Sequence, residues 1–406
     1  MEEYYWTYEN YIIFKPTFAE PIDDYIDIIS NYNNIIFSDY DDFDYIITNI
    51  KNNNLNLNSH LHNDLHKYKY KLSKFNRSFV NKNNKPFPLI KLEKLIFGYS
   101  FSQPLSNEFD QSINLKELIF GYTFNQELSM SLFKLTQLEK LIFGSNFNRP
   151  LLYSLKKLIN LKQLIFGTQF NIPLEDSLNE LINLKELTFG TNFNMKLHGS
   201  LHKLTQLEKL TFGANFNCEL NCSLGKLTQL KKLTFGYWFN KSIGFEFKNL
   251  TNLEELVFGW NFSRPVFESL KNLTQMKKLL FGELFNYPLS ELLCYLTKLE
   301  ELSLGYNFNQ ELELPPNIKI LTLNCNCQNI VDLLPNSIEQ LNLGKKFNLE
   351  LNNLPSTIKK IAFDSSNIYK KELNNLPRTL ETLVLPFKYN IQIDSPFENC
   401  TIYYWS

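Results

Sequence analysis

The sequence lacks several features that would point to other classes of protein. Its net charge is only −1, so no strong field favours nucleic acid or an anionic membrane as a partner. No apolar run approaches the roughly 20 residues that a membrane-spanning helix needs. The first residues also lack the basic stretch and apolar core of a signal peptide. We therefore predict an intracellular protein of the host or cell cytoplasm that binds neither membrane nor nucleic acid.

Cysteine is scarce, and the six cysteines are irregularly spaced. A disulfide framework of the kind found in small secreted domains would need more cysteines in a shorter chain. The pairs Cys218/Cys222 and Cys325/Cys327 lack the second pair that a zinc site requires. This usage predicts a reducing compartment.

Motifs for catalysis and cofactor binding are missing as well. The sequence holds no Gly-rich phosphate loop, nucleophile elbow or dinucleotide fingerprint. His60, His62 and His66 cluster, and two of them have the four-residue spacing of helical metal ligands, but no acid or cysteine is positioned to complete a site. His198 and His202 share this spacing at variable positions. We predict no enzyme, no cofactor and no metal.

A strict internal period is what the chain does have. Ten glycines are each 23 residues from the next: Gly98, Gly121, Gly144, Gly167, Gly190, Gly213, Gly236, Gly259, Gly282 and Gly305. A fixed period of this length indicates a solenoid, in which each repeat packs only on its neighbours.

Each copy, numbered from its first leucine, has the same order of residue types. Positions 4 and 6 are apolar, as in Leu141 and Phe143, and this alternation predicts a short strand over positions 3 to 6. The glycine at position 7 permits a positive φ or a close approach of backbones. Position 10 is Phe in all ten copies, from Phe101 to Phe308, which predicts a buried aromatic spine.

Position 11 is Asn in eight of the ten copies. A ladder of side-chain amides that satisfies unpaired backbone groups explains this conservation of type along the chain. The return segment often reads Ser-Leu-x-x-Leu, as at Ser131–Leu135. It is too short for a long helix, so a 3₁₀ or a one-to-two-turn α segment is expected.

The pattern resembles the FNIP repeat, a relative of the leucine-rich repeat known from giant viruses and Dictyostelium-type amoebae. The name-giving tetrapeptide is present as Phe170-Asn171-Ile172-Pro173. The resemblance implies an α/β-type repeat solenoid, with a leucine-rich-repeat-like parallel β-sheet on the concave face and short helical, 3₁₀ or irregular return segments. It also implies a protein–protein interaction module without catalytic residues.

Five regions follow from these patterns. Residues 1–70 show no 23-residue pattern and are expected to form a cap, and 71–91 look like a degenerate repeat. FNIP repeats cover 92–312, and Leu-Pro repeats of about 20 residues cover 313–393, which gives about fourteen strands. Residues 394–406 form a cap or tail. Some FNIP-repeat proteins carry an N-terminal F-box, so the alternative for 1–70 is a degenerate segment that binds a ubiquitin-ligase adaptor and makes the chain a substrate receptor.

The charges at position 2 alternate in sign. From Glu93 to Glu381, twelve of the thirteen neighbouring pairs are opposite, and only Lys162–Lys185 is not. Stacked strands place like positions about 4.8 Å apart, so alternation prevents repulsion and penalises a slip of one repeat. A charged surface for an ionic partner is the other interpretation. We favour register control, because a self-neutralised ladder has little net field.

Two columns are candidate contacts for an unknown protein partner. At position 5, four neighbouring isoleucines would form an apolar stripe if exposed: Ile96, Ile119, Ile142 and Ile165. Positions 8 and 9 carry aromatic residues: Tyr99 and Tyr122 at one end, and Tyr237, Trp238, Trp260 and Tyr306 further along. Tyr and Trp dominate interface hot spots, although strand propensity and packing over the turn could also explain both columns.

The ladder makes a testable prediction. Glu254→Lys places the new lysine between Lys231 and Lys277. We expect the melting temperature to drop at low salt and to recover partly at high salt, because salt screens the repulsion. Thermal denaturation at two ionic strengths measures this. A melting temperature that ignores salt would mean that these charges are merely solvated.

Overall fold

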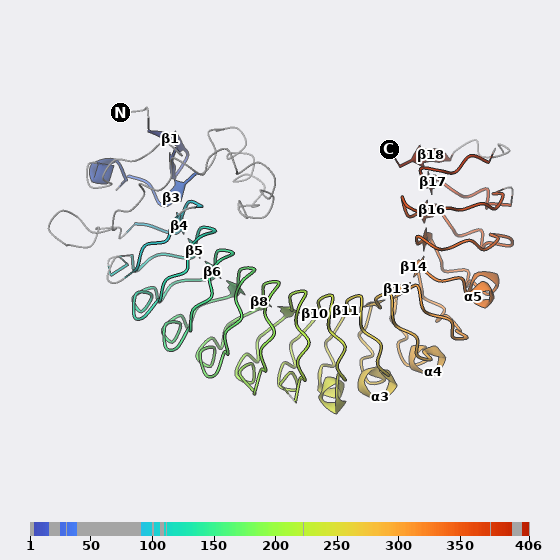
Figure 1. The fold of residues 1–406 in the computed structure, drawn as a ribbon, viewed down its shortest axis with the longest axis horizontal. Helices are drawn as coiled ribbons and strands as arrows, with labels where there is room; N and C mark the ends of the chain where they lie inside the picture. The colour runs from blue at the N-terminus through green and yellow to red at the C-terminus, as the bar shows by residue number, and fades with distance from the viewer. Residues whose placement is uncertain are drawn as a thin grey trace. The chain divides into compact units, whose positions relative to one another are not determined.

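The computed structural model describes residues 4–15, 25–29, 31–38, 91–99, 101–105, 109–110, 112–221, 223–373, 375–391 and 400–405. Contacts divide the chain into two compact units, Met1–Leu207 and Glu208–Ser406. Within each unit, successive turns of chain stack side by side, with the strands on one side and the return segments on the other (Figure 1). None of the helices in the described part is long and apolar enough to cross a membrane.

The first unit contains an almost entirely parallel sheet. Strands β2 to β8 pair in parallel in sequence order, and β1 pairs antiparallel with β2. The bounds are β1 (Tyr5–Tyr8), β2 (Tyr11–Phe14), β3 (Asn34–Phe37), β4 (Lys94–Ile96), β5 (Glu117–Ile119), β6 (Lys140–Ile142), β7 (Gln163–Ile165) and β8 (Glu186–Thr188), with helix α1 at Ile26–Ile29.

The second unit continues the same construction, and all of its strand pairs are parallel. Its strands are β9 (Lys209–Thr211), β10 (Lys232–Thr234), β11 (Glu255–Val257), β12 (Lys278–Leu280), β13 (Glu301–Leu304), β14 (Ile320–Leu323), β15 (Gln340–Leu343), β16 (Lys360–Phe363), β17 (Thr382–Leu385) and β18 (Thr401–Tyr404). Its helices are η4 (Phe245–Asn249), α3 (Phe267–Leu270), α4 (Ser290–Leu293) and α5 (Gln328–Asp332). Strands β4 to β17 are the fourteen that the repeats predict.

Close packing of backbones explains the glycine column. A Cβ added to Gly144 would overlap the carbonyl oxygen of Gly121, and the same overlap recurs at each described step within a unit. None of the position 7 glycines in the described segments has a positive φ. Of the two roles that the sequence allowed, the structure therefore selects the close approach. Neighbouring turns can stack at this distance only because position 7 carries no side chain.

The predicted Asn ladder is present. The Asn148 backbone N–H donates to Oδ1 of Asn125 at 2.9 Å, and the Asn171 N–H donates to Oδ1 of Asn148 at 2.9 Å. The same bond links Asn240 to Asn217 in the second unit. Each amide side chain thus satisfies a backbone donor one repeat later, where no strand provides an acceptor.

The predicted aromatic spine is also present, and it is double. The rings at position 10 are buried and stack between repeats, with Phe147 and Phe170 at 6.1 Å between centroids. Within a repeat, the position 6 ring stacks on the position 10 ring, at 4.1 Å for Phe143 and Phe147. In the shorter repeats Tyr369 and Tyr389 replace Phe and stay in the spine, because their hydroxyls donate to the carbonyls of Leu349 and Lys371.

The return segments are helical only in part. The second unit contains η4, α3, α4 and α5, as the sequence predicts, and α1 lies between β2 and β3, whereas the other described return segments are turns or irregular. A left-handed residue recurs at one repeat position in six return segments: Ser129, Leu152, Glu175, His198, Asn221 and Gly244, the last at the start of η4. The same left-handed start therefore precedes both turns and a 3₁₀ helix.

The expectation that residues 1–70 lack a 23-residue pattern is wrong. β2 and β3 pair in register as Ile12↔Ile35 and Ile13↔Ile36, and Ile36 aligns with Ile96 of β4. The paired positions of β2 and β3 are 23 residues apart, so both strands are repeats with the Ile-Ile-Phe form of the strand. β1 pairs antiparallel with β2, and the expected cap stays a prediction. Residues 39–90, with the three clustered histidines, part of the proposed adaptor segment and nearly all of the predicted entry repeat 71–91, lie outside the described residues.

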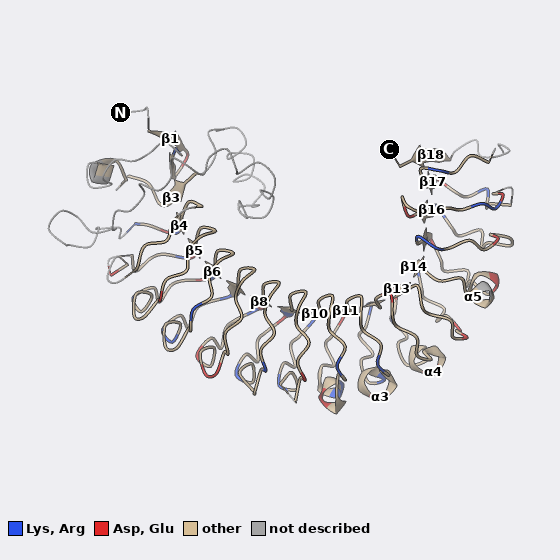
Figure 2. Ribbon diagram, in the orientation of Figure 1, with Lys and Arg blue, Asp and Glu red and all other residues tan. Residues whose placement is uncertain are grey.

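Ion pairs between repeats confirm the charge ladder in a modified form. At position 2 a lysine that follows a glutamate pairs with it, as in Lys116–Glu93 at 3.0 Å and Lys277–Glu254 at 2.9 Å. At position 3 the direction is reversed, as in Lys232–Glu255 at 2.7 Å. These ion pairs therefore join neighbouring repeats two at a time. Both signs of charge are distributed through each unit (Figure 2).

The hydrogen bond from Lys277 holds the pKa of Glu254 below its ordinary value of 4.5, and the charges of Lys277, Lys231 and Lys232 act in the same direction against desolvation. A carboxyl whose pKa is lower in the folded state stabilises the fold above its ordinary pKa. That contribution is lost as the pH falls through the lowered value. The group is largely exposed, so the effect of one pair is small.

The glycine column makes a prediction about stability. Gly144→Ala forces the added methyl group into a backbone carbonyl, which cannot move without separating two turns. We expect a loss of about 1–3 kcal/mol or more in the free energy of unfolding, measured with denaturant. Ser145→Ala, one residue further along the same turn, is the matched control and should change little. Equal stability of the two variants would contradict the close-approach explanation.

Candidate functional site

Positions 8 and 9 project from the array because of the turn that contains them. The N–H of position 10 donates to the carbonyl of position 7, as from Phe239 to Gly236 at 3.3 Å. Positions 7 and 10 are held in the stack by the glycine contact and the aromatic spine. The two central residues of the turn, at positions 8 and 9, therefore lie on the surface. Their side chains do not pack in the core.

Three aromatic residues predicted from the sequence come together on these turns. Tyr237 stacks on Trp260 with 5.7 Å between ring centroids, and it meets Trp238 edge-on at 4.9 Å. Their exposed fractions are 42% for Tyr237, 52% for Trp238 and 46% for Trp260. We call these three residues the aromatic cluster. It presents large apolar rings to solvent in an arrangement fixed by two neighbouring turns.

Tyr306 is exposed as expected, but it is engaged with other side chains. Glu283 occupies position 8 in the repeat between it and the aromatic cluster, and accepts the Tyr306 backbone N–H at 2.7 Å. Lys346 donates to the Tyr306 hydroxyl at 2.9 Å and lies over its ring, 4.1 Å from the centroid. The structure thus separates Tyr306 from the other three aromatic residues and makes it a polar flank.

Leu284 is a neighbour that the sequence reading missed. It lies at position 9, is 38% exposed, and its backbone N–H donates to the carbonyl of Trp260 at 3.1 Å. The sequence does mark Leu284 as unusual, because position 9 is polar in most other repeats. Leu284 therefore extends the apolar surface beside the aromatic cluster.

The other predicted aromatic pair lies in the first unit. Tyr99 and Tyr122 stack with 4.6 Å between centroids and an interplanar angle of 8°. Both are half-buried, and their backbone carbonyls accept the N–H groups of Thr123 and Asn146. The pair packs over its own turns more closely than the aromatic cluster does.

The expectation that the position 5 isoleucines form an exposed stripe is wrong for three of the four. Ile96, Ile119 and Ile142 are at most 5% exposed and belong to one cluster with Ile13 and Ile36 of the first strands. Trp6, Tyr8, Tyr11 and Ile165 pack against this cluster and are partly buried. The sheet face near the first strands is therefore a second hydrophobic core, and a partner could not reach these side chains without displacing their cover.

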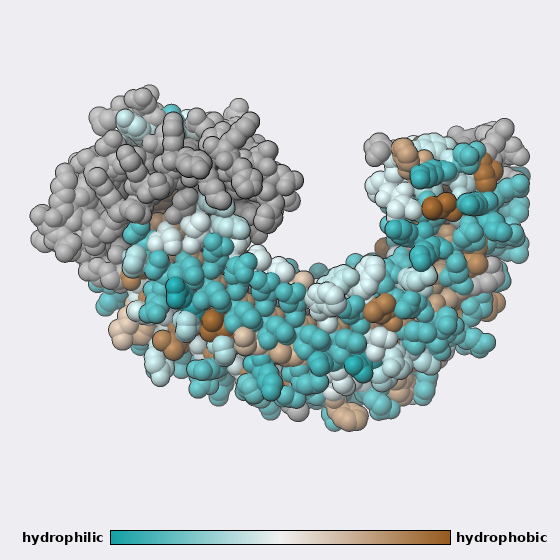
Figure 3. All heavy atoms as spheres, viewed as in Figure 1, coloured by the Kyte–Doolittle hydropathy of each residue, from teal (hydrophilic) through white to brown (hydrophobic). Residues whose placement is uncertain are grey.

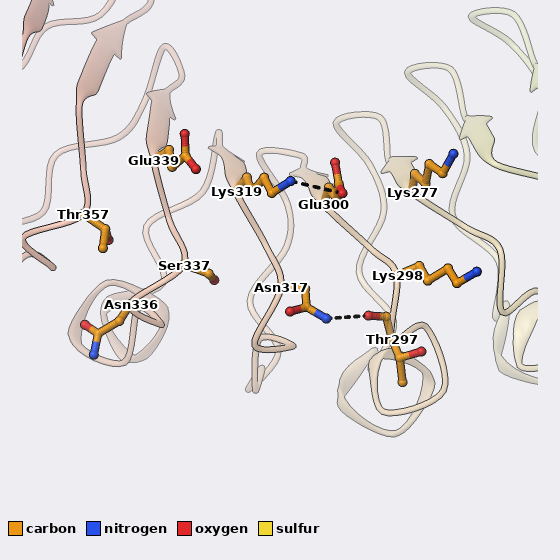
Figure 4. Close-up of a pocket in the computed structure, with 10 residues that line it drawn as sticks. All are labelled: Lys277, Thr297, Lys298, Glu300, Asn317, Lys319, Asn336, Ser337, Glu339 and Thr357. Carbon is orange, nitrogen blue, oxygen red and sulfur yellow. Dashed lines mark hydrogen bonds and ion pairs between the residues drawn. The ribbon is translucent and has the colours of Figure 1, made fainter.

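A shallow polar pocket of about 440 Å³ lies along the shorter repeats of the second unit (Figure 4). Its charged lining residues are already paired: Lys319 with Glu300 at 3.2 Å, Lys277 with Glu254, Glu339 with Lys359, and Lys298 with the Gln275 amide oxygen at 2.7 Å. The charged residues that line the pocket are largely position 2 residues of the charge ladder. The ion pairs neutralise the other charges of the lining, and Lys298 keeps a single positive charge because its partner is a neutral amide, so the pocket gives an ionic ligand only a weak field.

Side chains that could bind a metal do not gather in the described segments. No three His, Cys, Asp or Glu residues gather there as metal ligands would. The nearest arrangement is a thiol pair, in which a hydrogen bond with Cys327 and burial raise the pKa of Cys325, while the same bond lowers the pKa of Cys327. Both thiols are buried, and Cys327 also donates to the Phe308 carbonyl at 3.0 Å. The pair is part of the core.

Comparison with known families agrees with the repeat described above. The FNIP Repeat family model matches residues 308–346, which span the change from 23-residue to 20-residue repeats. Residues 308–346 are thus similar to the FNIP repeat. The matched stretch begins at Phe308 and Phe347 follows it directly, so it covers two successive repeats of the array. A search of the curated proteins finds no match to this chain.

Among solved structures, the chain is similar to leucine-rich-repeat proteins. CroV588 of the giant virus CroV, a circular LRR protein, is 21% identical over 99% of this chain and 77% of that protein, with a TM-score of 0.45. An internalin of Listeria monocytogenes is 19% identical over 67% and 87%, with a TM-score of 0.49. An LRR protein of Leptospira interrogans is 20% identical over 73% and 90%, with a TM-score of 0.44.

The exposed rings predict a contrast in stability. Replacing both Tyr237 and Trp260 by Ser removes no core contact, so we expect the free energy of unfolding to change by no more than about 1 kcal/mol. Phe262→Ala removes a buried ring from the spine of the same repeat and should cost about 3–5 kcal/mol. Chemical denaturation of both variants checks this. A large loss in the double variant would show that the aromatic cluster is structural.

Proposed function

We propose that the protein is a non-enzymatic scaffold that binds a protein partner through the aromatic cluster. The observation that carries the proposal is that three half-exposed aromatic rings meet on two neighbouring turns, where Tyr237 stacks on Trp260 and meets Trp238 edge-on. Three such rings offer on the order of 300 Å² of surface. The largest exposed apolar patch of an ordinary protein has about this size and is often functional.

The physical state of the cluster favours binding. Aromatic side chains lose little rotamer entropy when a partner covers them, because each has only two rotatable bonds. Stacking between turns restricts these rings before the partner arrives, which lowers that loss further. Leu284 widens the apolar area, and Lys346 with Glu283 supplies a polar rim beside it. An apolar centre with a polar edge is the usual anatomy of an interface.

The repeat fold supports the same function. Solenoids present extended surfaces whose framework is independent of the residues displayed on it. Here the core is built by positions 4, 6 and 10 and the close approach by position 7, so positions 8 and 9 are free to vary. Their change from Ser145, Thr168 and Ala214 to the aromatic cluster has no counterpart in the packing of the core. Cys294, Cys325, Cys327 and Cys400 form no disulfide, which favours an intracellular, reducing location.

The adaptor-binding alternative stays a prediction for residues 1–70. Tyr11–Phe14 and Asn34–Phe37 are strands of the sheet, so this part of the region has a structural role in the array. Tyr99 and Tyr122 likewise stay predicted contacts for a second surface in the first unit.

Affinity purification with mass spectrometry tests the proposed site. The bait is the full chain, compared with the variant Tyr237→Glu/Trp260→Glu. Glutamate is tolerated in this column, since Glu283 occupies position 8 in the natural sequence. We expect the variant to lose one or more proteins that the wild type captures while its circular dichroism and melting stay unchanged.

The matched control is Thr168→Glu/Thr191→Glu, which adds the same charge to the same column away from the aromatic cluster. It should keep the captured proteins. Proteins retained equally by both variants would overturn the proposed site, and loss from both would mean that charge, rather than the rings, governs capture.

A further inference from the structure

Strand β18 differs from the other strands of the second unit in its exposure. It pairs in parallel with β17, with Leu383↔Ile402 and Leu385↔Tyr404 in register. Leu383 and Leu385 are fully buried, whereas Ile402 is 36% and Tyr404 59% exposed. The core column that runs through the unit therefore ends in two apolar side chains that face solvent. Among the described residues, no second strand pairs with β18 in this unit (Figure 1).

The backbone of β18 also has a free side. The Thr401 N–H donates to the Glu381 carbonyl at 2.9 Å and the Trp405 N–H to the Leu385 carbonyl at 3.3 Å. Alternate residues of a strand point their N–H and C=O groups to the same neighbour. The groups of Ile402 and Tyr404 therefore point away from β17. A row of outward donors and acceptors of this kind is a template for another strand.

The protection that usually guards such an edge is missing from β18. Proteins place lysine or other charges on edge strands to prevent pairing with a second molecule. Every strand from β4 to β17 has a charged residue at position 2, ending with Glu381, but β18 has Cys400 there and Thr401 at position 3. Residues 400–405 carry no charge, and four of the six are Ile, Tyr or Trp. Tyr403 and Trp405 are 55% and 47% exposed.

We propose that β18 is a docking site for a second copy of this chain, through antiparallel pairing of the two β18 strands. The occupant follows from self-complementarity. Around a two-fold axis at Tyr403, Ile402 of each copy lies opposite Tyr404 of the other. These are the residues with outward backbone groups, so each pair exchanges two hydrogen bonds. Both also face the core side, so each isoleucine covers a tyrosine and the exposed end of the core is closed.

This register makes a specific demand on Tyr403. On the opposite face of the sheet, the two copies of Tyr403 are a non-hydrogen-bonded pair, with Cα atoms about 4.5 Å apart. Like charges at this position repel across the axis, and opposite charges attract. No other register of the two strands brings residue 403 against itself.

Sedimentation equilibrium over a range of concentrations tests the proposal. We expect the full chain to be a dimer in equilibrium with monomer. Tyr403→Lys and Tyr403→Glu should each weaken the dimer by roughly tenfold or more in Kd at low salt. An equimolar mixture of the two variants should recover the dimer, as a heterodimer. Unchanged melting temperatures of the separate variants show that they are folded.

A second pair of variants isolates the backbone. Tyr404→Pro removes an outward N–H that β17 does not use, so it should abolish the dimer and leave the fold intact. Tyr404→Thr keeps that N–H and should retain more of the dimer. A wild-type chain that is monomeric at every concentration overturns the proposal, as does a mixture of charge variants that fails to associate. Oligomers that keep growing with concentration would indicate a head-to-tail contact instead, and would also overturn it.

Discussion

The distance between stacked turns is the constraint on which the rest of this structure depends. At position 7 the backbone of one repeat occupies the space in which the next would place a Cβ, so only glycine fits. This contact brings equivalent atoms of successive repeats into hydrogen-bonding and stacking range. The strand ladder, the Asn ladder and the two phenylalanine columns all use that spacing. If two neighbouring turns separate, the strand pairing, the Asn ladder and the phenylalanine stacking between those turns are all lost.

Different positions of the repeat serve the core, the backbone hydrogen bonds and the surface. This separation explains how such a regular chain can have a specific surface. Core positions are fixed by packing and position 11 by a backbone donor that must be satisfied. Positions 2 and 3 hold ion pairs whose signs compensate. The view of the molecule in Figure 3 agrees, since most of the described surface on that face is hydrophilic and hydrophobic residues are scattered. The aromatic cluster and the β18 edge differ from this hydrophilic surface. The packing of the repeat does not explain either feature, so we look to binding for the explanation.

Much of the fold follows from the sequence because the same residue types recur at the same positions in ten copies of the repeat. The register of β4 to β17, the burial of position 10 and the role of position 11 were all predictable from spacing and residue type. The first strands were missed because only Ile-Ile-Phe survives there, without glycine or the Phe-Asn pair. The isoleucine column was misjudged for a related reason. Period-2 alternation says which face a side chain is on, but not what else covers that face.

The sequence by itself determined the solenoid, its strand positions and the aromatic residues at positions 8 and 9, since these depend on contacts at a fixed separation along the chain. Tertiary structure decided what was exposed. It buried Ile96, Ile119 and Ile142 under residues of the first strands, tied Tyr306 to Lys346, and left Tyr237, Trp238 and Trp260 open. The physical reason is that solvent exposure depends on every segment that packs against a surface, and such segments need not share the repeat.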